Sequence, residues 1–495
     1  MTANGLLYVP PHSCACFIKA KLSGFYAFAP RRDHERVFTA DELGYLERGR
    51  AYDQVDAIIA RSKISAEDCP TYRCDVARSG WANCTVPIAL KQIWRAPIGG
   101  RLTSPIAANG KVFIASVDTH TVYALDANSG EVIWTYTAGG RVDSPPTFYR
   151  GLLIFGCRDG YVYCLRASDG ELVWRFRAAP QDRRIVAHGQ LESVWPVHGS
   201  VLIVNDVLYF VAGRSSYLDN GIFLYRLDPK TGEKLSVTHI DSRDPVTEME
   251  PRDVIRGTNM PGALPDILSS DGSSIFMRHS RFDLNGVPQK ENVPHLFSPA
   301  GFLDDSWWHR TYWIIGTRMA SGWGGWPIVG NTVHSGRLLV IDEFNVYGFG
   351  RESYATHGSH PGLGRTHYQL FAASRELLPP PKPKARKKRR ARPPVISRVK
   401  YLWTKRIPVI VRAMVLADKT LFIAGPPNSD WEGMDALMAW EGKRNALLWV
   451  ISASNGKKLA EYRLPSPPVF DGMIAAMGRL FICTQDGKVI CLGGT

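Results

Sequence analysis

The chain has 495 residues, of which 45% are hydrophobic, and this is enough apolar surface for a large core. Its 45 glycines, 33 prolines and 11% aromatic residues are typical of a protein rich in strands and turns rather than helices. An apolar run of 18 residues is absent, which excludes an ordinary transmembrane helix, and residues 1–11 lack the pattern of a signal peptide. Much of the net charge of +14 comes from the run 382–392.

The first strands are expected close to the N-terminus. Residues 4–9 and 24–29 are short apolar stretches beside glycines, which predicts two neighbouring strands. Residues 92–95 have the tryptophan-bearing pattern of an outer strand. We therefore expect one sheet from these three stretches, with residues 31–90 as an insertion inside it.

A repeat of forty residues follows. Residues 104–134 and 144–174 align without a gap at an offset of 40 positions. Both copies begin with Ser-Pro and end with a tryptophan, Trp134 or Trp174, and the lead-in to the first copy carries Trp94. Each copy predicts four strands of about five residues joined by Gly, Asn and Asp turns. One such meander cannot bury both of its faces, whereas copies stacked around an axis can, so the repeat predicts a β-propeller.

More degenerate copies continue along the chain. They cover residues 208–235, 266–283, 337–373, 421–462 and 474–492. We expect one all-β propeller over residues 1–495, with eight four-stranded blades or, as the alternative, seven. The last copy ends just after its third strand, which predicts a final blade without its outer strand and a chain that is part of a longer protein.

The regularity of the repeat varies between regions. The best-defined units lie at 92–240, a degenerate blade with aromatic loops at 241–335, a disordered Pro-rich insertion at 376–399, and the final blades at 400–495. The aromatic residues near 307–313 and 321–327 either pack against the body or stack on a carbohydrate or peptide. The basic residues 382–392 form either a solvated loop or a contact with an anionic surface such as lipid or nucleic acid.

The repeat ends carry a family signature. Residues 124–134 read Ala-Leu-Asp-Ala-Asn-Ser-Gly-Glu-Val-Ile-Trp, which resembles the tryptophan-docking motif A-x-D-x-x-S/T-G-x-x-x-W of quinoprotein-like (PQQ-repeat) propellers, and residues 164–174 are a second match. The chain also looks like bacterial PQQ-repeat proteins with large insertions. This resemblance implies a quinoprotein-like β-propeller in which Trp94, Trp134 and Trp174 dock successive sheets. It also implies a periplasmic or cell-surface location.

The family contains both enzymes and scaffolds. It includes PQQ-dependent dehydrogenases and the non-catalytic, BamB-like proteins of the outer membrane. The dehydrogenases that hold PQQ under a ring of adjacent cysteines have a Cys-Cys pair, whereas Cys14 and Cys16 here are separated by an alanine. A calcium-binding set is also missing, so we expect no cofactor and favour a non-catalytic binding or scaffold module. A dehydrogenase using PQQ with calcium is the alternative.

Charged and aromatic residues stand where the inner strands of the propeller begin. Because first strands line the central channel, these residues are expected at one channel mouth, where they would bind a protein or a small polar ligand. The alternative is a set of strand-end salt bridges in solvent. Catalytic residues are not predicted, since the sequence offers neither a nucleophile–base pair nor a phosphate loop. The mouth residues are Arg101, Arg141, Asp143, Glu192, Trp195, His198, Asp266, Arg412 and Asp471.

The nine cysteines fall into two groups. Cys164 and Cys491 share one strand position in the repeat and are expected in the core. His12, Cys14 and Cys16 are weak candidates for a soft metal site, which Cys69, Cys74 and Cys84 could complete. A local disulfide and free thiols are the alternatives.

Overall fold

The computed structural model describes the chain except for parts of several long segments. The described residues are 1–10, 19, 25–30, 38–39, 42–244, 246–247, 249–250, 262–306, 312–317, 332–352, 368–380, 397–428 and 434–494. Strands dominate, and the described helices are short: η3 (Tyr52–Gln54), α1 (Val55–Arg61) and α3 (Met434–Trp440). The expectation of an all-β protein is confirmed.

The forty-residue repeat forms two antiparallel four-stranded sheets of the same register. The first contains β7 (Ile106–Ala108), β8 (Lys111–Ser116), β9 (Thr121–Asp126) and β10 (Val132–Thr137). The second contains β11 (Thr147–Tyr149), β12 (Leu152–Gly156), β13 (Tyr161–Arg166) and β14 (Leu172–Arg177). Trp134 lies opposite Ala124 in the first sheet, just as Trp174 lies opposite Cys164 in the second.

The degenerate copies also form sheets. The next two are β17 (Leu202–Val204), β18 (Val207–Ala212), β19 (Ile222–Leu227) and β20 (Lys234–Ile240), then β21 (Ser269–Ser270), β22 (Ser274–Met277), β23 (Ser280–Asp283) and β24 (Pro288–Gln289). The following two are β25 (His295–Phe297), β26 (Trp313–Gly316) and β27 (Ser335–Gly336), then β28 (Leu338–Ile341), β29 (Asn345–Arg351), β30 (Tyr368–Leu377) and β31 (Val399–Lys405). After them comes the sheet of β32 (Ala413–Ala417), β33 (Thr420–Gly425), β34 (Ala446–Ser452) and β35 (Lys458–Leu464).

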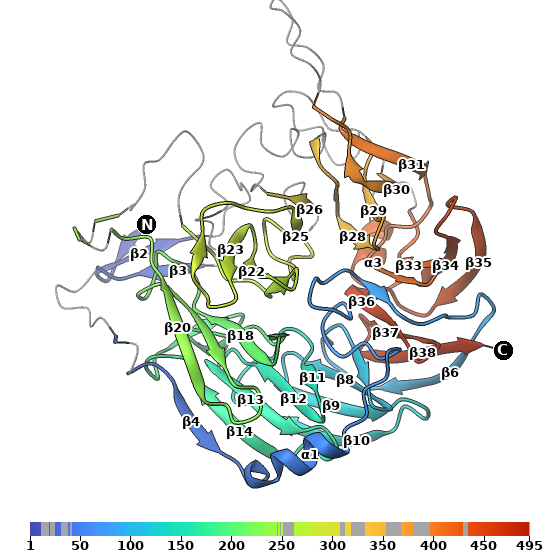
Figure 1. Ribbon diagram of the computed structural model, residues 1–495. Coiled ribbons are helices and arrows are strands. Elements are labelled where there is room, and N and C mark those ends of the chain that lie inside the picture. Colours follow the sequence, from blue (N-terminus) through green and yellow to red (C-terminus); the bar gives the residue numbers. More distant parts are fainter. Residues whose placement is uncertain are drawn as a thin grey trace, which may run out of the picture.

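Buried side chains fill the spaces between neighbouring sheets. Phe113 of β8 packs with Leu153 and Phe155 of β12, whereas Ile114, the next residue on β8, faces the opposite way and packs with Phe481 of the last sheet. Alternate residues of one strand therefore serve two interfaces, as the pleat requires. The sheets follow one another in chain order around a common centre (Figure 1), which confirms the β-propeller. The number of blades stays a prediction, since parts of several sheets lie outside the described residues.

The last sheet corrects the expected pairing of the N-terminal stretches. It contains β36 (Pro468–Ala476), β37 (Arg479–Thr484) and β38 (Lys488–Gly494), and its fourth strand is β6 (Leu90–Pro97). Trp94 of β6 lies opposite Cys491. The expectation of a missing outer strand was wrong, because β6, from the N-terminal part of the chain, pairs with β38 and supplies the outer strand.

The N-terminal stretches form a sheet of their own. It consists of β1 (Thr2–Ala3), β2 (Leu6–Val9) and β3 (Tyr26–Phe28), and β6 is not part of it. The predicted first blade with 31–90 as its insertion was therefore wrong. That region instead supplies two edge strands: β4 (Tyr45–Arg48) extends the sheet at β14, and β5 (Trp81–Ala82) lies parallel to β32.

Each outer-strand tryptophan docks on the following sheet. The indole Nε1 atoms donate hydrogen bonds to turn carbonyls: Trp94 to Ala127 (3.0 Å), Trp134 to Ala167 (3.1 Å), Trp174 to Lys230 (3.1 Å) and Trp403 to Ala453 (2.8 Å). In the same turns a glycine lies under each ring, and an added Cβ atom there would collide with it. These turns need glycine also because their φ angles are positive, for example +76° at Gly130.

Candidate functional site

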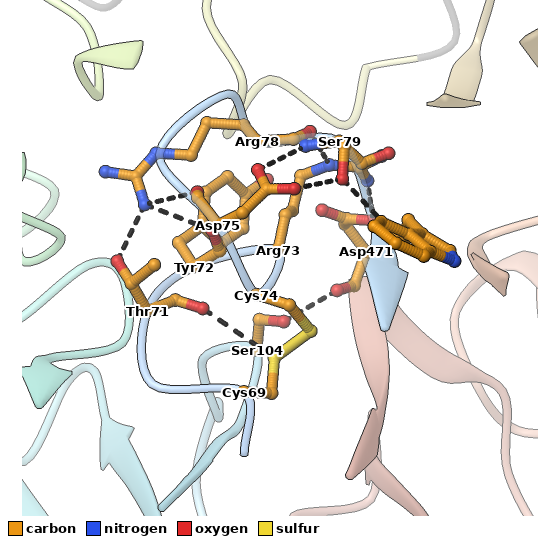
Figure 2. Close-up of a disulfide and its surroundings, with 11 residues drawn as sticks. Cys69, Thr71, Tyr72, Arg73, Cys74, Asp75, Arg78, Ser79, Ser104 and Asp471 are labelled. Carbon is orange, nitrogen blue, oxygen red and sulfur yellow. Dashed lines mark hydrogen bonds and ion pairs between the residues drawn. A yellow bond between two sulfur atoms is a disulfide. The ribbon is translucent and has the colours of Figure 1, made fainter. Parts of the chain in front are cut away.

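Residues 67–82, the central segment, run past the inner strands of the propeller (Figure 2). Backbone hydrogen bonds join it to four sheets: Phe148 N to Pro70 O (2.7 Å), Ser270 N to Val76 O (2.8 Å), Ile341 N to Ser79 O (3.0 Å) and Leu416 N to Gly80 O (3.1 Å). Cys69 and Ala107 of β7 exchange two further bonds of 2.7 and 2.9 Å. Contacts from one short segment to the first strands of so many sheets place it at the centre of the ring.

Arg78 ties the central segment to two of these sheets. Its side chain is 0% exposed, and its guanidinium donates to Leu268 O (3.0 Å) and Val201 O (3.2 Å), which directly precede β21 and β17. It also donates to Thr71 Oγ1 (2.7 Å) and Tyr72 O (3.1 Å) within the segment. Burial lowers the pKa of Arg78 to about 10, so the guanidinium remains charged at neutral pH.

Arg73 contacts three further sheets, those that contain β26, β28 and β36. It forms a buried ion pair with Asp471 of β36 (Nη1 to Oδ1, 2.6 Å), donates to Leu339 O of β28, and lies 4.5 Å above the ring of Trp313 in β26. Burial raises the pKa of Asp471, and the charge of Arg73 offsets only part of this effect. Tyr72, between the two arginines, packs edge-on against Phe302 at 6.2 Å.

A disulfide closes the central segment on itself. Cys69 and Cys74 are bonded, and they lie five positions apart in sequence. Arg73, Cys74 and Arg78 all have positive φ angles (60°, 74° and 58°), which cost non-glycine residues about 1–3 kcal/mol each. The local disulfide, one of the alternatives from the sequence, is therefore present, and the strained loop is held in place by covalent and hydrogen bonds together.

Two ion networks contain residues that were expected at the channel mouth. Arg141 donates from Nε to Glu192 Oε1 at 2.6 Å, and Arg214 donates to Glu192 Oε2 at 2.9 Å. Burial would raise the pKa of Glu192, but the charges of Arg158 and Arg141 outweigh it and lower the pKa. This carboxylate is thus an ionised, internal partner of arginines.

Asp143 is the centre of the second network. It pairs with Arg158, lies 2.9 Å from Nδ1 of His198, and accepts a hydrogen bond from Gly199 N (2.9 Å). Burial alone would raise the pKa of Asp143, yet the charges of Arg158 and His198 hold it well below 3.8. Asp143, His198, Arg141 and Glu192 were all expected at the mouth, and the structure brings the members of each pair into contact.

The other expected mouth residues are scattered. Arg101 is exposed and pairs with Asp118, and Trp195 is buried with its Nε1 donating to Asp219 O at 2.7 Å. Asp266 accepts from Ile267 N and Phe302 N, and burial raises its pKa. Arg412, also buried, pairs with Asp305 at 3.1 Å. These side chains take part in separate contacts, and a joint binding site at a channel mouth stays a prediction. Sequence reasoning missed the central segment, whose Arg73 pairs with Asp471.

A hairpin projects between the second and third repeat sheets. It consists of β15 (Arg184–Ala187) and β16 (Gln190–Ser193), and Val186 lies opposite Leu191. Both side chains are exposed, at 72% and 60%. Both ends of the hairpin are fixed, since Glu192 near its base is buried in its arginine pair. Gln190, beside the turn, donates from Nε2 to Asp118 O at 3.0 Å. Sequence reasoning did not single out this exposed pair, although the alternation in residues 184–193 was visible.

The remaining predicted sites give little chemistry. His12, Cys14, Cys16, the basic run 382–392 and the loops 307–311 and 318–331 lie outside the described residues. Within the described part of the chain, no group of three His, Cys, Asp or Glu side chains could hold a metal ion, and no helix is long and apolar enough to cross a membrane. The free cysteines there are all buried: Cys84, Cys157, Cys164, Cys483 and Cys491.

The comparisons with known proteins agree with this architecture. Residues 90–259 match the family model of the outer membrane protein assembly factor BamB. No curated protein sequence matches the chain. Among solved structures, the quinohemoprotein alcohol dehydrogenase from Comamonas testosteroni is 14% identical with a TM-score of 0.55 (90% of this chain, 84% of that one). A europium-containing methanol dehydrogenase is 10% identical with a TM-score of 0.50 (89% and 100%). BamB from Moraxella catarrhalis is 12% identical with a TM-score of 0.43 (82% and 98%).

The fold is a β-propeller, and it is similar to the propellers of the PQQ-repeat class. Within that class, residues 90–259 carry repeats of the BamB type. At these low identities the similarity to the dehydrogenases establishes a shared fold, and the chemistry has to be judged from the residues of this chain.

The residues at the centre do not fit PQQ with a calcium ion. Calcium needs several oxygen ligands, but the buried carboxylates here already have protein partners. Asp143 and Glu192 pair with arginines, and Asp266 accepts backbone N–H groups. Asp471 pairs with Arg73 through Oδ1, which leaves its buried Oδ2 as a single oxygen without a hydrogen bond from the described residues.

Proposed function

We propose that this protein is a non-catalytic propeller that binds a protein partner through the hairpin β15–β16. The observation that carries the proposal is the exposed cross-strand pair Val186–Leu191 on a rigidly anchored base. Large apolar side chains that stand out from a fixed support are typical of protein-binding anchors, since they lose little conformational freedom when buried by a partner.

The anchoring contacts support this role. In addition to the contacts of Glu192 and Gln190, Ser193 N donates to Arg158 O at 2.8 Å. The hairpin therefore packs on the turn between β12 and β13. Arg183 and Arg184 at its base are half-exposed and paired with aspartates. An exposed apolar pair with a polar, charge-balanced rim favours a partner with an apolar cleft. The family description, an outer membrane protein assembly factor, agrees with protein binding.

Photocrosslinking from position 188, at the hairpin tip, tests this proposal in the producing cells. We expect one discrete adduct with a protein, and we expect its yield to fall at least about tenfold in the Val186→Ser/Leu191→Ser variant. The matched control is Leu235→Ser/Val287→Ser, which removes two side chains of similar exposure (51% and 52%) elsewhere on the surface. An adduct that forms equally well in the hairpin variant would refute the proposed docking site.

A cofactor titration tests the non-catalytic half of the proposal. The purified protein is mixed with PQQ and calcium, and both absorbance and dye reduction are recorded. Because the buried carboxylates are engaged, we expect neither stoichiometric binding nor turnover. Stoichiometric binding together with turnover of an alcohol would overturn the scaffold proposal and favour the dehydrogenase alternative.

A further inference from the structure

The Cys69–Cys74 disulfide occupies an unusual place for a covalent cross-link. Both cysteines belong to the central segment, which lies outside the forty-residue repeat but contacts the inner strands of many sheets. The bond therefore does not join two sheets. It fixes the shape of the one element to which the sheets attach.

The groups beside the disulfide depend on that shape. Arg73 and Cys74 are both in the left-handed region (φ 60° and 74°), and Cys74 N donates to Thr71 O at 2.9 Å, within the closed loop. From this conformation the side chain of Arg73 reaches Asp471 and Leu339 O. Gly80 packs against the same guanidinium so closely that an added Cβ would collide with it. Relaxation of the loop would displace the side chain of Arg73 and its two contacts.

Among the described cysteines, Cys74 is the one that is only partly buried, whereas its partner Cys69 is 0% exposed. Cys74 borders a small hollow that Arg73, Ser104 and Asp471 also line. Figure 2 shows the disulfide beside these residues. The free thiols of the described residues are different, because all of them are buried. Burial raises the pKa of the thiols of Cys157 and Cys164 well above 9.0, which disfavours the thiolate that exchange requires.

We propose that the Cys69–Cys74 bond is a redox-dependent lock on the central segment. A small thiol reductant supplies two electrons and two protons: the S–S bond breaks, each cysteine sulfur becomes S–H, and two reductant thiols become one disulfide. In the oxidised protein the segment holds the inner strands together. In the reduced protein the segment detaches from those strands while the outer parts of the sheets stay folded, so the centre of the propeller opens.

Hydrogen exchange of the folded wild-type protein, with and without a phosphine or thiol reductant, tests this lock. The reporter amides are those that donate to the central segment, namely Phe148, Ser270, Ile341 and Leu416. After reduction, which is verified by a mass gain of about 2 Da, we expect them to exchange on the order of tenfold faster. Peptides from the outer strands β13 and β14 should exchange at an unchanged rate.

A variant separates the lock from side effects of the reductant. Cys69→Ala/Cys74→Ala should show the fast exchange without reductant and no further change when reductant is added. If this variant does not fold, the hydrogen exchange of the reduced wild-type protein decides whether the proposal holds.

Two results would overturn the proposal. One is unchanged exchange at the four reporter amides in protein whose disulfide is shown to be reduced. The other is equal acceleration in inner and outer strands, since the bond would then stabilise the whole fold and would not lock one segment. Neither result bears on the hairpin, so the lock and the proposed docking site stand or fall separately.

Discussion

Replacing Arg78 by methionine is the sharpest test of how the central segment holds the sheets together. Methionine keeps much of the apolar stem but removes all five hydrogen bonds of the guanidinium. Thr71 Oγ1 and Val201 O retain a bond to Thr147, whereas the carbonyl groups of Tyr72 and Leu268 lose a donor. Each buried acceptor left without its donor costs about 1–3 kcal/mol. Removal of a buried charge recovers part of that loss, so we expect a net destabilisation of about 3 kcal/mol.

The expected change in thermal stability follows from the size of the protein. With about 2.1 cal/mol/K of unfolding entropy per residue, 495 residues give roughly 1 kcal/mol/K, so the Tm should fall by about 3 °C. Scanning calorimetry and urea unfolding measure this loss, and Arg184→Met is the control. Arg184 is half-exposed and paired only with Asp182, so that its replacement should cost less than about 0.5 kcal/mol. An Arg78→Met protein as stable as the wild type would refute the reasoning.

Two further substitutions test other parts of the fold. Gly130→Ala should destabilise the protein in urea by about 1–3 kcal/mol more than Gly110→Ala, because both glycines have positive φ but only the Gly130 position would bring a Cβ atom against the Trp94 ring; equal losses would contradict the docking geometry. Asp143→Asn should destabilise the protein at neutral pH by leaving Arg158 without its carboxylate. The pKa of Asp143 lies well below 3.8, so its contribution is present above about pH 4 and is lost as the pH falls through the folded value. The gap in unfolding free energy between variant and wild type should therefore not shrink between pH 7 and 5, and denaturation curves at several pH values would detect a deviation.

The sequence was informative where structure is local. Residues 104–174 contain apolar stretches of about five residues, turn glycines and a tryptophan at the end of each unit. From this pattern the repeat predicted the sheets and their stacking. The registers of Trp134 and Trp174 are equal because equal spacing places them at equal positions on their strands. The β-propeller could be predicted because each sheet has to bury both of its apolar faces against neighbouring sheets.

Long-range pairing could not be predicted in the same way. Trp94 fits the outer strand of either an N-terminal blade or the last blade, since the motif identifies the type of strand and not its neighbour. The contact between Arg73 and Asp471 spans 398 positions, and residues 67–82 show no periodicity that would mark them as the central element. Buried arginines that donate to backbone carbonyls leave no pattern in sequence, because any strand can supply a carbonyl group. For that reason the sequence did not predict which groups the buried arginines contact.

Limited trypsin digestion of the native, oxidised protein tests most directly whether residues 67–82 lie inside the propeller. Arg73 and Arg78 are buried, whereas Arg184 and Lys443 have side chains more than half exposed. We predict early cleavage after the exposed residues and none after Arg73 or Arg78 until the protein unfolds. Cleavage after Arg78 as fast as after Arg184 would contradict the account, because a protease cannot reach a segment that the inner strands surround.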